Sequence, residues 1–347
     1  LKCPYDVPKF STRLGIVRKC DLCHTRLAAG EAPACAQACP TQAIRIVTVP
    51  IVPQRNQDAD TSFLPGAPDP AYTPPTTRYV TRRPFPRSVR AADAQTLRVQ
   101  PAHLPLAVML TLIGAAVGLS TLGAAQASGL ISPESLTPAG FPAAHANIVV
   151  PLMALGTGAL GLAASALHLG QPLRAWRIFL GWRTSWLSRE AMLFGGWFAI
   201  AAGATFIPAL NPFAAIVGWA ALTCSAMIYV DTRRSHWRGA LTVPRFFGTA
   251  LLVPLALVAP ALAATGVLLK IAWESRGFFG TDTSARLQRG PLLGTVALRD
   301  LLGTTAALLL VTAPGVTALL LLLAAELVER LLFFRAVDAP KMPGHPA

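Results

Sequence analysis

The sequence predicts a mainly α-helical protein, a polytopic transmembrane helix bundle of about seven spans preceded by a small cysteine-rich domain. Its 347 residues are 53% hydrophobic and only 13% charged, with a mean hydropathy of +0.50, a balance that suits lipid better than water. Long apolar runs follow one another after residue 101. Five of the six cysteines lie within the first 39 residues, which predicts a metal site or a disulfide framework there.

Composition divides the chain into four regions, which are residues 1–50, 51–102, 103–337 and 338–347. The first holds five of the six cysteines and ends in the alternating apolar run 43–47, which predicts a short strand. The second is rich in proline and arginine. Because proline fixes φ and lacks an N–H, this region is expected to be an extended linker or tail. The third carries the apolar runs, and the last is a short tail.

Seven apolar runs make up the predicted bundle. Each approaches the roughly 20 residues that a helix needs to cross about 30 Å of hydrocarbon. Because lipid offers no hydrogen-bond partners, every backbone N–H and C=O must be paired within the structure, so these runs are predicted to be spanning helices. They cover residues 104–126, 148–167, 190–208, 213–231, 246–269, 294–312 and 315–334.

The loops between the predicted spans explain the formal net charge of +14. Arginines crowd the arm before the first span and the loops 168–189 and 232–245, whereas the alternate loops 127–147 and 209–212 contain no Lys or Arg. By the positive-inside rule, the N-terminal region and the two basic loops are expected in the cytoplasm. The loop 270–293 breaks this pattern, because it is also basic. Nucleic-acid binding is not expected, since the arginines flank the membrane rather than gather on one face.

Four of the cysteines form the motif C-x2-C-x11-C-x3-C-P, made of Cys20, Cys23, Cys35, Cys39 and Pro40. Thiolates at this spacing suit iron–sulfur ligation. Structural zinc is the alternative, but a four-cysteine zinc site more often ends in C-x2-C. A disulfide framework is less favoured because nothing marks these residues as exported, and residues 1–10 lack the apolar core of a signal peptide.

The stretch VRKCDLCHTRLAAGEAPACAQACPTQAI at 17–44, with the leading Cys3-Pro4-Tyr5, resembles a known family. It is similar to the last cysteine group of the four-cluster ferredoxin-like subunits that serve molybdopterin oxidoreductases such as dimethyl sulfoxide reductase. The resemblance implies 4Fe-4S clusters held by a partial ferredoxin-like iron–sulfur domain.

The resemblance also implies a ligand set. In ferredoxin-type chains, the fourth cysteine of a C-P group ligates the partner cluster. No cluster would then be closed within this sequence, so we expect a preceding N-terminal portion to supply the remaining ligands. A rearranged cluster that combines Cys3 with the first three cysteines of the motif is the alternative. In the favoured set, one cluster takes Cys20, Cys23 and Cys35, a second takes Cys39 and a third takes Cys3.

A second polar group lies between the second and third predicted spans, where His, Arg, Trp, Ser and Glu are concentrated. Arg and Trp commonly anchor helix ends at the lipid headgroups, and this accounts for many of them. An ionisable residue at the end of a spanning helix is unfavourable unless it is paired or functional. His168 and Glu190, on consecutive helices, are therefore predicted to form a proton-accepting pair.

Nearly all of 104–340 resembles the dimethyl sulfoxide reductase membrane-anchor family. The resemblance implies that His168 and Glu190 bind and oxidise menaquinol or ubiquinol, with Arg174 and Arg177 as supporting residues. The stretches that carry it are HLGQPLRAW and RTSWLSRE within 168–190, SAMIYVD at 225–231, PRFF at 244–247 and AELVERLLFF at 325–334.

The same resemblance implies an electron path. Electrons from quinol would pass through the 4Fe-4S clusters to a separate molybdopterin-containing catalytic subunit in anaerobic respiration. The chain would be a multi-pass protein of the bacterial inner membrane, with its iron–sulfur domain on the cytoplasmic side. No haem is expected, because only His168 among the histidines lies close to a predicted helix interior.

The remaining polar residues of the spans are expected to be structural. Glu326, Glu329 and Arg330 have the spacing of a helix-packing cluster, and the adjacent Arg299 and Asp300 are expected to mark an interface. Two alternative functions remain open. A membrane transporter or proton pump with a metal-binding regulatory domain would carry convergent carboxylates on broken spans near the bilayer midplane. A purely structural anchor would not need the predicted quinol site.

Overall fold

The structure, a computed structural model, describes only part of the chain. The described residues are 8–47, 64, 67, 76–86, 88–91, 96–134, 146–167, 169, 172–338 and 343–346. Two of the predicted site residues, Cys3 and His168, lie outside them. The chain divides into two compact units, Leu1–Thr96 with Ala339–Ala347 and Leu97–Asp338. We call them the N-terminal unit and the bundle.

The N-terminal unit begins with a short hairpin. Strands β1 (Lys9–Ser11) and β2 (Ile16–Arg18) pair antiparallel, with Phe10 opposite Val17. The turn between them passes through Gly15 at a φ of 62°, a region that glycine enters without steric cost.

The rest of the N-terminal unit consists of short elements. Residues 43–47, predicted to be a strand, pair with no strand among the described residues, so that prediction is wrong. An alternating apolar run becomes a strand only where a partner edge accepts its backbone hydrogen bonds. The elements after the hairpin are α1 (His24–Ala28), α2 (Ala34–Gln37) and the antiparallel pair β3 (Val89–Ala91) and β4 (Pro343–Pro346).

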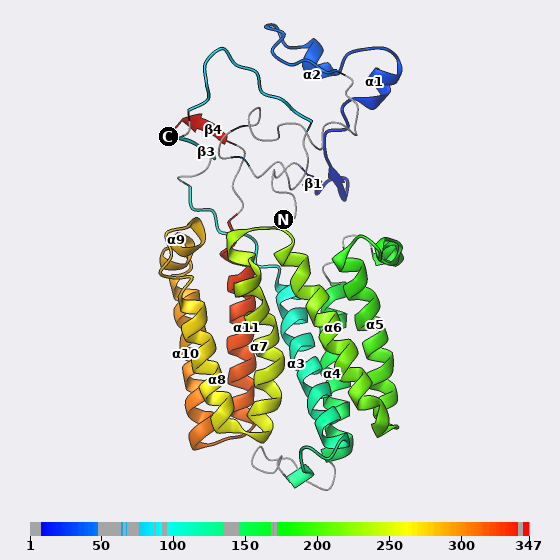
Figure 1. Ribbon diagram of the computed structural model, residues 1–347, viewed down its shortest axis with the longest axis vertical. Helices are drawn as coiled ribbons and strands as arrows, with labels where there is room; N and C mark the ends of the chain where they lie inside the picture. Colours follow the sequence, from blue (N-terminus) through cyan, green and yellow to red (C-terminus); the bar gives the residue numbers. More distant parts are fainter. Residues whose placement is uncertain are drawn as a thin grey trace. The chain divides into compact units, whose positions relative to one another are not determined.

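Eight long helices form the bundle within the described residues, which confirms the predicted helical class. They are α3 (Leu104–Ala127), α4 (Ala146–Ala166), α5 (Trp186–Ala204), α6 (Asn211–Val230), α7 (Gly239–Val258), α8 (Pro260–Ser275), α10 (Leu293–Thr312) and α11 (Val316–Arg335). Their connections contain the short helices η5 (Pro172–Gly181), η6 (Pro208–Leu210), η7 (Ser235–Trp237) and α9 (Thr283–Arg289). Successive long helices run in opposite directions (Figure 1).

The predicted span 246–269 is wrong as a single helix. It is divided between α7 and α8, which are joined by Ala259 alone. Ala259 has φ −145° and ψ 68°, outside the helical region. The cause is Pro260, because a proline disfavours the helical conformation of the residue before it and is itself well placed in the first turn of a helix. The chain therefore folds back at a point where hydropathy alone shows a continuous apolar run.

Five helices of the described chain are long and apolar enough to cross a membrane, namely α3, α4, α6 with the preceding η6, α7 and α10. Helix α8 is shorter, with 16 residues. Helices α5 and α11 contain charged residues, which lower their hydropathy.

The additional turn places all the basic connections at one end of the bundle. Residues 167–185, 231–238 and 276–292 connect helices at the upper end in Figure 1, and each contains arginine. The connections at the opposite end, which are residues 128–145, 205–210, 259 and 313–315, contain no Lys or Arg in the sequence. The loop 270–293 therefore no longer breaks the positive-inside pattern, because an even number of long helices precedes its basic part and brings it to the basic end.

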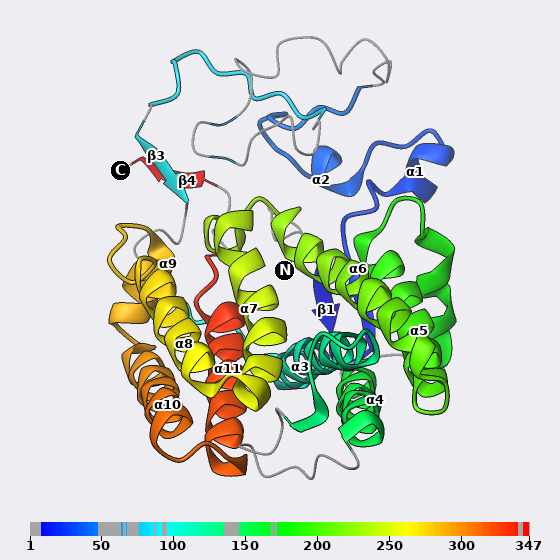
Figure 2. The same ribbon diagram turned by 60° about the horizontal axis from the view of Figure 1, so that its bottom comes forward.

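Helix α3 lies at the centre of the bundle, against α4, α6, α7 and α11 (Figure 2). Small residues allow this close approach. A Cβ at Gly118 of α3 would collide with the carbonyl oxygen of Ala250 on α7. The buried indole of Trp197 on α5 donates to Ser120 Oγ at 3.2 Å, which fixes α5 against the same central helix.

Candidate functional site

The loop that carries Cys20 and Cys23 folds around the first sulfur. Leu22 and Cys23 have φ of 57° and 51°, a region that L residues adopt only where local contacts hold them. The Leu22 amide donates to Cys20 Sγ at 3.4 Å, and the Cys23 amide donates to Asp21 Oδ1 at 2.9 Å. Both thiols are free. The loop thus presents two sulfurs, with an amide already directed at one of them.

Cys35 lies on α2 and Cys39 follows it. The Ala43 amide donates to Cys39 Sγ at 3.3 Å, and Thr41 Oγ1 lies 3.6 Å from the same sulfur. The Thr41 hydroxyl, followed by the amides of Ile44 and Ala43, lowers the pKa of the Cys39 thiol to about 7. These hydrogen bonds favour the thiolate, which is the form that binds metal.

The chemistry of these donors fits a 4Fe-4S cluster, because they are free thiols with amides directed at sulfur. Among the residues that the structure describes, no three Cys, His, Asp or Glu side chains lie close enough to hold a metal ion together. The assignment of Cys20, Cys23 and Cys35 to one cluster therefore stays a prediction. The same holds for the roles of Cys39 and Cys3 in neighbouring clusters.

Glu190 is a buried carboxyl near the start of α5. It is 6% exposed, and the fully buried Ser225 of α6 lies beside it. Within the described part of the chain, Glu190 forms no ion pair. A buried carboxyl without a counter-charge is unfavourable unless it is functional, so its environment matches the prediction of a reactive group.

The connection between α4 and α5 decides which predicted residues can approach Glu190. Helix α4 ends at Ala166 and α5 begins at Trp186, so the end of α4 and the start of α5, with Glu190, belong to the basic end of the bundle. The pairing of His168 with Glu190 stays a prediction, because His168 lies outside the described residues.

Arg174 and Arg177, the predicted supporting residues, are exposed on η5. The Arg177 guanidinium stacks over the ring of Trp176 at 5.9 Å. Neither arginine forms a hydrogen bond or an ion pair with Glu190 within the described chain. Their exposure beside aromatic side chains is typical of residues that anchor a helix at lipid headgroups.

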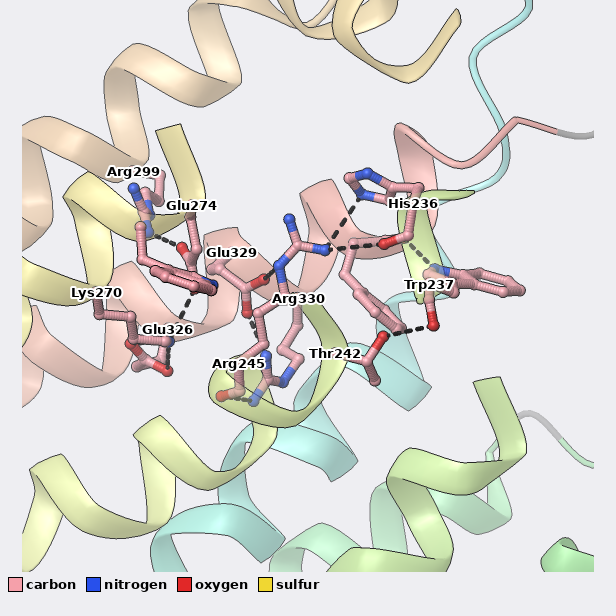
Figure 3. A network of polar contacts seen from close by, with 12 residues as sticks. His236, Trp237, Thr242, Arg245, Lys270, Glu274, Arg299, Glu326, Glu329 and Arg330 are labelled. Atoms are coloured by element: carbon pink, nitrogen blue, oxygen red, sulfur yellow. Dashed lines mark hydrogen bonds and ion pairs between the residues drawn. The ribbon is translucent and has the colours of Figure 1, made fainter. Parts of the chain in front are cut away.

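A buried ionic network lies between α7, α8, α10 and α11 (Figure 3). Apart from His236, its members lie within the long helices of the bundle, and most are less than a tenth exposed. Buried charges are tolerated only where they are paired and hydrogen-bonded. The network consists of His236, Arg245, Thr249, Lys270, Glu274, Arg299, Asp300, Glu326, Glu329 and Arg330.

One half of the network joins α8, α10 and α11. Asp300 Oδ1 accepts from Arg299 Nη1 at 2.6 Å, and Arg299 also pairs with Glu274. Lys270 Nζ lies 3.6 Å from Glu274 Oε1 and donates to Glu326 Oε1 at 2.6 Å. Glycine at position 248 makes room for this lysine, since a Cβ there would lie 3.0 Å from Lys270 Cδ and Cε.

The other half joins α7 and α11. The Thr249 hydroxyl donates to the Glu326 carboxylate and accepts from Arg330 Nη2 at 2.9 Å. Arg330 pairs with Glu329, whose Oε1 lies 3.0 Å from Arg245 Nε. The series of contacts is therefore unbroken from Asp300 on α10 to Arg245 on α7.

His236 lies at the end of this series, in η7 outside the long helices. Its Nε2 lies 3.4 Å from Arg245 Nη1, and the side chain is buried. Burial, together with the charge of Arg245, lowers the pKa of His236 well below its ordinary value. The imidazole is therefore neutral near neutral pH.

A cavity of about 280 Å³ adjoins the network. Polar and apolar side chains both line it. The polar ones are His236, Arg245, Glu274, Ser275, Gln288, Arg299, Asp300 and Glu329, and the apolar ones are Phe278, Phe279, Leu293, Val296, Ala297 and Leu332.

Sequence analysis identified part of this network. The predicted packing cluster of Glu326, Glu329 and Arg330 is confirmed, since all three are buried and interact. Arg299, expected with Asp300 to mark an interface, is 7% exposed and pairs with Glu274 of α8 inside the bundle. The other charged residues of the network also interrupt apolar stretches of the sequence. A single helix over 246–269, however, would place Arg245 and Lys270 at opposite membrane surfaces, so their proximity could not be predicted.

Comparison with known proteins assigns both parts of the chain. Residues 1–49 match the 4Fe-4S dicluster domain, and residues 142–271 match the DMSO reductase anchor subunit (DmsC) family. The chain is 35% identical to a sulfite dehydrogenase subunit of Allochromatium vinosum over 165 residues, which are 40% of this chain and 48% of that protein.

Two further relatives match only a short segment. One of the anaerobic dimethyl sulfoxide reductase proteins of Haemophilus influenzae is 41% identical over 44 residues, 13% of this chain and 22% of that protein. The thiosulfate reductase electron transfer subunit PhsB of Salmonella typhi is 46% identical over 44 residues, 12% of this chain and 23% of that protein. The chain thus spans less than half the length of these curated relatives. It is an integral membrane protein whose residues 1–49 match the 4Fe-4S dicluster domain and whose residues 142–271 match the DMSO reductase anchor subunit family.

Proposed function

We propose that this chain is the membrane-anchor and electron-transfer subunit of a molybdopterin oxidoreductase. It oxidises menaquinol or ubiquinol and passes the electrons through 4Fe-4S clusters to a separate catalytic subunit in anaerobic respiration. The observation that carries the proposal is the buried carboxyl of Glu190, which forms no ion pair among the described residues and lies in the segment that matches the anchor family, on the same chain as an iron–sulfur motif.

Quinol oxidation needs proton acceptors as well as an electron acceptor, because two O–H bonds break and two electrons leave. The Glu190 carboxylate accepts one proton, and the imidazole of His168 accepts the other. The Ser225 hydroxyl, beside Glu190, hydrogen-bonds the carboxyl or the quinol oxygen and so orients the ring. The iron–sulfur clusters, when bound, supply the one-electron acceptors that the side chains of this domain lack.

The charge distribution supports an orientation. The connections at one end of the bundle contain arginine, and the connections at the other end contain no Lys or Arg in the sequence. By the positive-inside rule, the basic end faces the cytoplasm of a bacterial inner membrane. Helix α5 begins at that end, at Trp186, and carries Glu190 near its start. The iron–sulfur domain and the catalytic subunit are accordingly proposed on the cytoplasmic side.

A transporter or proton pump is favoured by one observation, the ionic network that reaches Thr249 and Glu326 near the middle of α7 and α11. From there to the opposite end, the buried side chains of these helices are apolar within the described chain, as at Leu252 and Leu257 of α7 and Leu322 of α11. The polar series therefore does not cross the bundle. We prefer electron transfer, which needs no polar path between the two membrane surfaces.

The test uses the full-length gene product assembled with its catalytic partner in proteoliposomes that contain reduced menaquinone. We expect Glu190→Gln to lower the rate of quinol oxidation by about 10²-fold or more, as for the loss of a positioned proton acceptor, with normal assembly and iron content. Glu134→Gln, an exposed carboxyl at the opposite end, serves as the matched control. Oxidation of quinol at the wild-type rate by the Glu190→Gln complex would show that the proposed site is wrong.

A further inference from the structure

We propose that the cavity beside the ionic network is a second binding site, for a neutral hydroquinone-type ring taken from the bilayer. The cavity is lined by η7, α7, α8, α9, α10, α11 and the segments that join them, whereas the proposed oxidation site lies on α5 and α6. The ligand class is that of the proposed substrate, but binding in this cavity does not depend on Glu190.

The charges in the wall favour a neutral ligand. Arg245 and Arg299 face three carboxylates, those of Glu274, Asp300 and Glu329. Each guanidinium is already ion-paired, Arg299 with Glu274 and Asp300, and Arg245 with Glu329 at 3.0 Å. Lys270 and Arg330 pair with the carboxylates of Glu274 and Glu329 from behind, so the charges of the described network are balanced and neither an anion nor a cation finds a free counter-charge there. His236 adds no charge, because its burial keeps it neutral.

Several polar atoms of the wall still have hydrogen-bonding capacity. Arg245 Nε, Glu274 Oε1 and Glu329 Oε1 are buried and make no hydrogen bond among the described residues, although each lies in an ion pair. The three residues are at most 7% exposed. Leaving such groups unsatisfied is unfavourable, so they point to a ligand with both donors and acceptors.

A hydroquinone matches this pattern. Each of its hydroxyl groups donates one hydrogen bond and accepts others, so one can donate to Glu274 or Glu329 while accepting from Arg245. The aromatic face of the ring is matched by the apolar part of the lining, which includes Phe278 and Val296. A cavity that held only water would not need these apolar side chains.

The size and position of the cavity favour a ring that arrives from the membrane. Its volume of about 280 Å³ is near the lower limit of about 300 Å³ for ligand pockets, which suits a ring without its tail. At the rim, Phe279 is 76% exposed and Leu293 is 49% exposed. These apolar side chains provide a surface along which an isoprenoid tail can leave the cavity toward lipid.

The test is photolabelling of the intact complex with an azido-naphthohydroquinone, the reduced ring that carries both hydroxyl donors, followed by peptide mapping. We expect label on the segment 275–300, in the wild type and in Glu190→Gln. Ala297→Trp, which fills the cavity, should lower this labelling by at least about tenfold, the change that accompanies a loss of 1.4 kcal/mol in binding. Leu301→Trp, at a position that is 63% exposed and outside the cavity lining, is the matched control and should retain the label.

A second variant, Val296→Phe, guards against misfolding of the tryptophan variant and should lower the labelling in the same way. Absence of label on 275–300, or label that neither cavity-filling variant lowers, would overturn the inference. The proposed function is judged separately: loss of quinol oxidation in Glu190→Gln with no label on 275–300 supports oxidation at α5 and refutes the second site. Label on 275–300 with unchanged oxidation in Glu190→Gln supports the second site and refutes oxidation at Glu190.

Discussion

The pair formed by Lys270 and Glu326 allows the buried ionic network to be tested directly. Lys270 is 8% exposed and Glu326 is 5% exposed, and the two are joined by a hydrogen-bonded ion pair at 2.6 Å. Lys270→Met keeps the length of the side chain and removes its charge. The remaining partner of the Glu326 carboxylate on α7 is then the Thr249 hydroxyl.

Removing one partner of a buried ion pair typically destabilises a protein by ~3–5 kcal/mol, because the other charge is left uncompensated. We expect a value near ~3 kcal/mol, because Arg330 donates to the same threonine and keeps a positive charge nearby, and because a buried carboxyl can take up a proton instead of remaining charged. At about 2–4 °C per kcal/mol for a domain of this size, the expected fall in Tm is about 6–12 °C.

The assay is thermal unfolding of the purified complex in detergent, followed by the intrinsic fluorescence of its tryptophans. Lys270→Met with Glu326→Gln is the control, since replacing both members of a buried pair by neutral groups is often nearly neutral. We expect the double variant to recover most of the lost Tm. A single variant within about 2 °C of the wild type, or a double variant no more stable than the single one, would refute the energetic role given to this pair.

Three further predictions concern other parts of the chain. Burial lowers the pKa of His236 in the folded state, so below pH 6.5 the unfolded chain takes up a proton that the folded chain does not, and the folded state loses stability. His236→Gln should therefore reduce the fall in Tm between pH 7 and pH 5. Gly118→Ala should lower Tm by several degrees, as expected for ~1–3 kcal/mol of overpacking against the carbonyl of Ala250, whereas Gly195→Ala, with open space around it, should not. Cys39→Ser in the full-length complex should reduce the iron content and remove the electron paramagnetic resonance signal of one cluster; unchanged iron would show that this thiolate is not a ligand.

The general class of this protein was readable from local features. Apolar runs of membrane length can satisfy their backbone only as helices, and a C-x3-C-P group after a C-x2-C pair suits iron–sulfur ligation. The sequence also indicated Glu190, because an ionisable residue at the end of a spanning helix is unfavourable unless it is paired or functional. Its burial against α6 is in keeping with that interpretation.

The arrangement of the second half of the bundle was not readable in this way. Hydropathy treats 246–269 as one span and so separates Arg245 from Lys270 by the thickness of a membrane. The conformational restriction that Pro260 imposes on Ala259 is local, but its consequence is not. It turns the chain back, returns the basic loop after α8 to the same end as the other basic loops, and brings both cations into contact with carboxylates of α11.

Composition and spacing thus establish a membrane bundle with an iron–sulfur motif, because both depend on short-range rules of hydrogen bonding and ligand geometry. The pairing of Arg299 with Glu274, and the cavity beside them, depend on which helix faces lie against each other. Those contacts join residues that are distant in sequence, and the energy of a buried charge depends on its neighbours in space. Only the folded chain defines those neighbours.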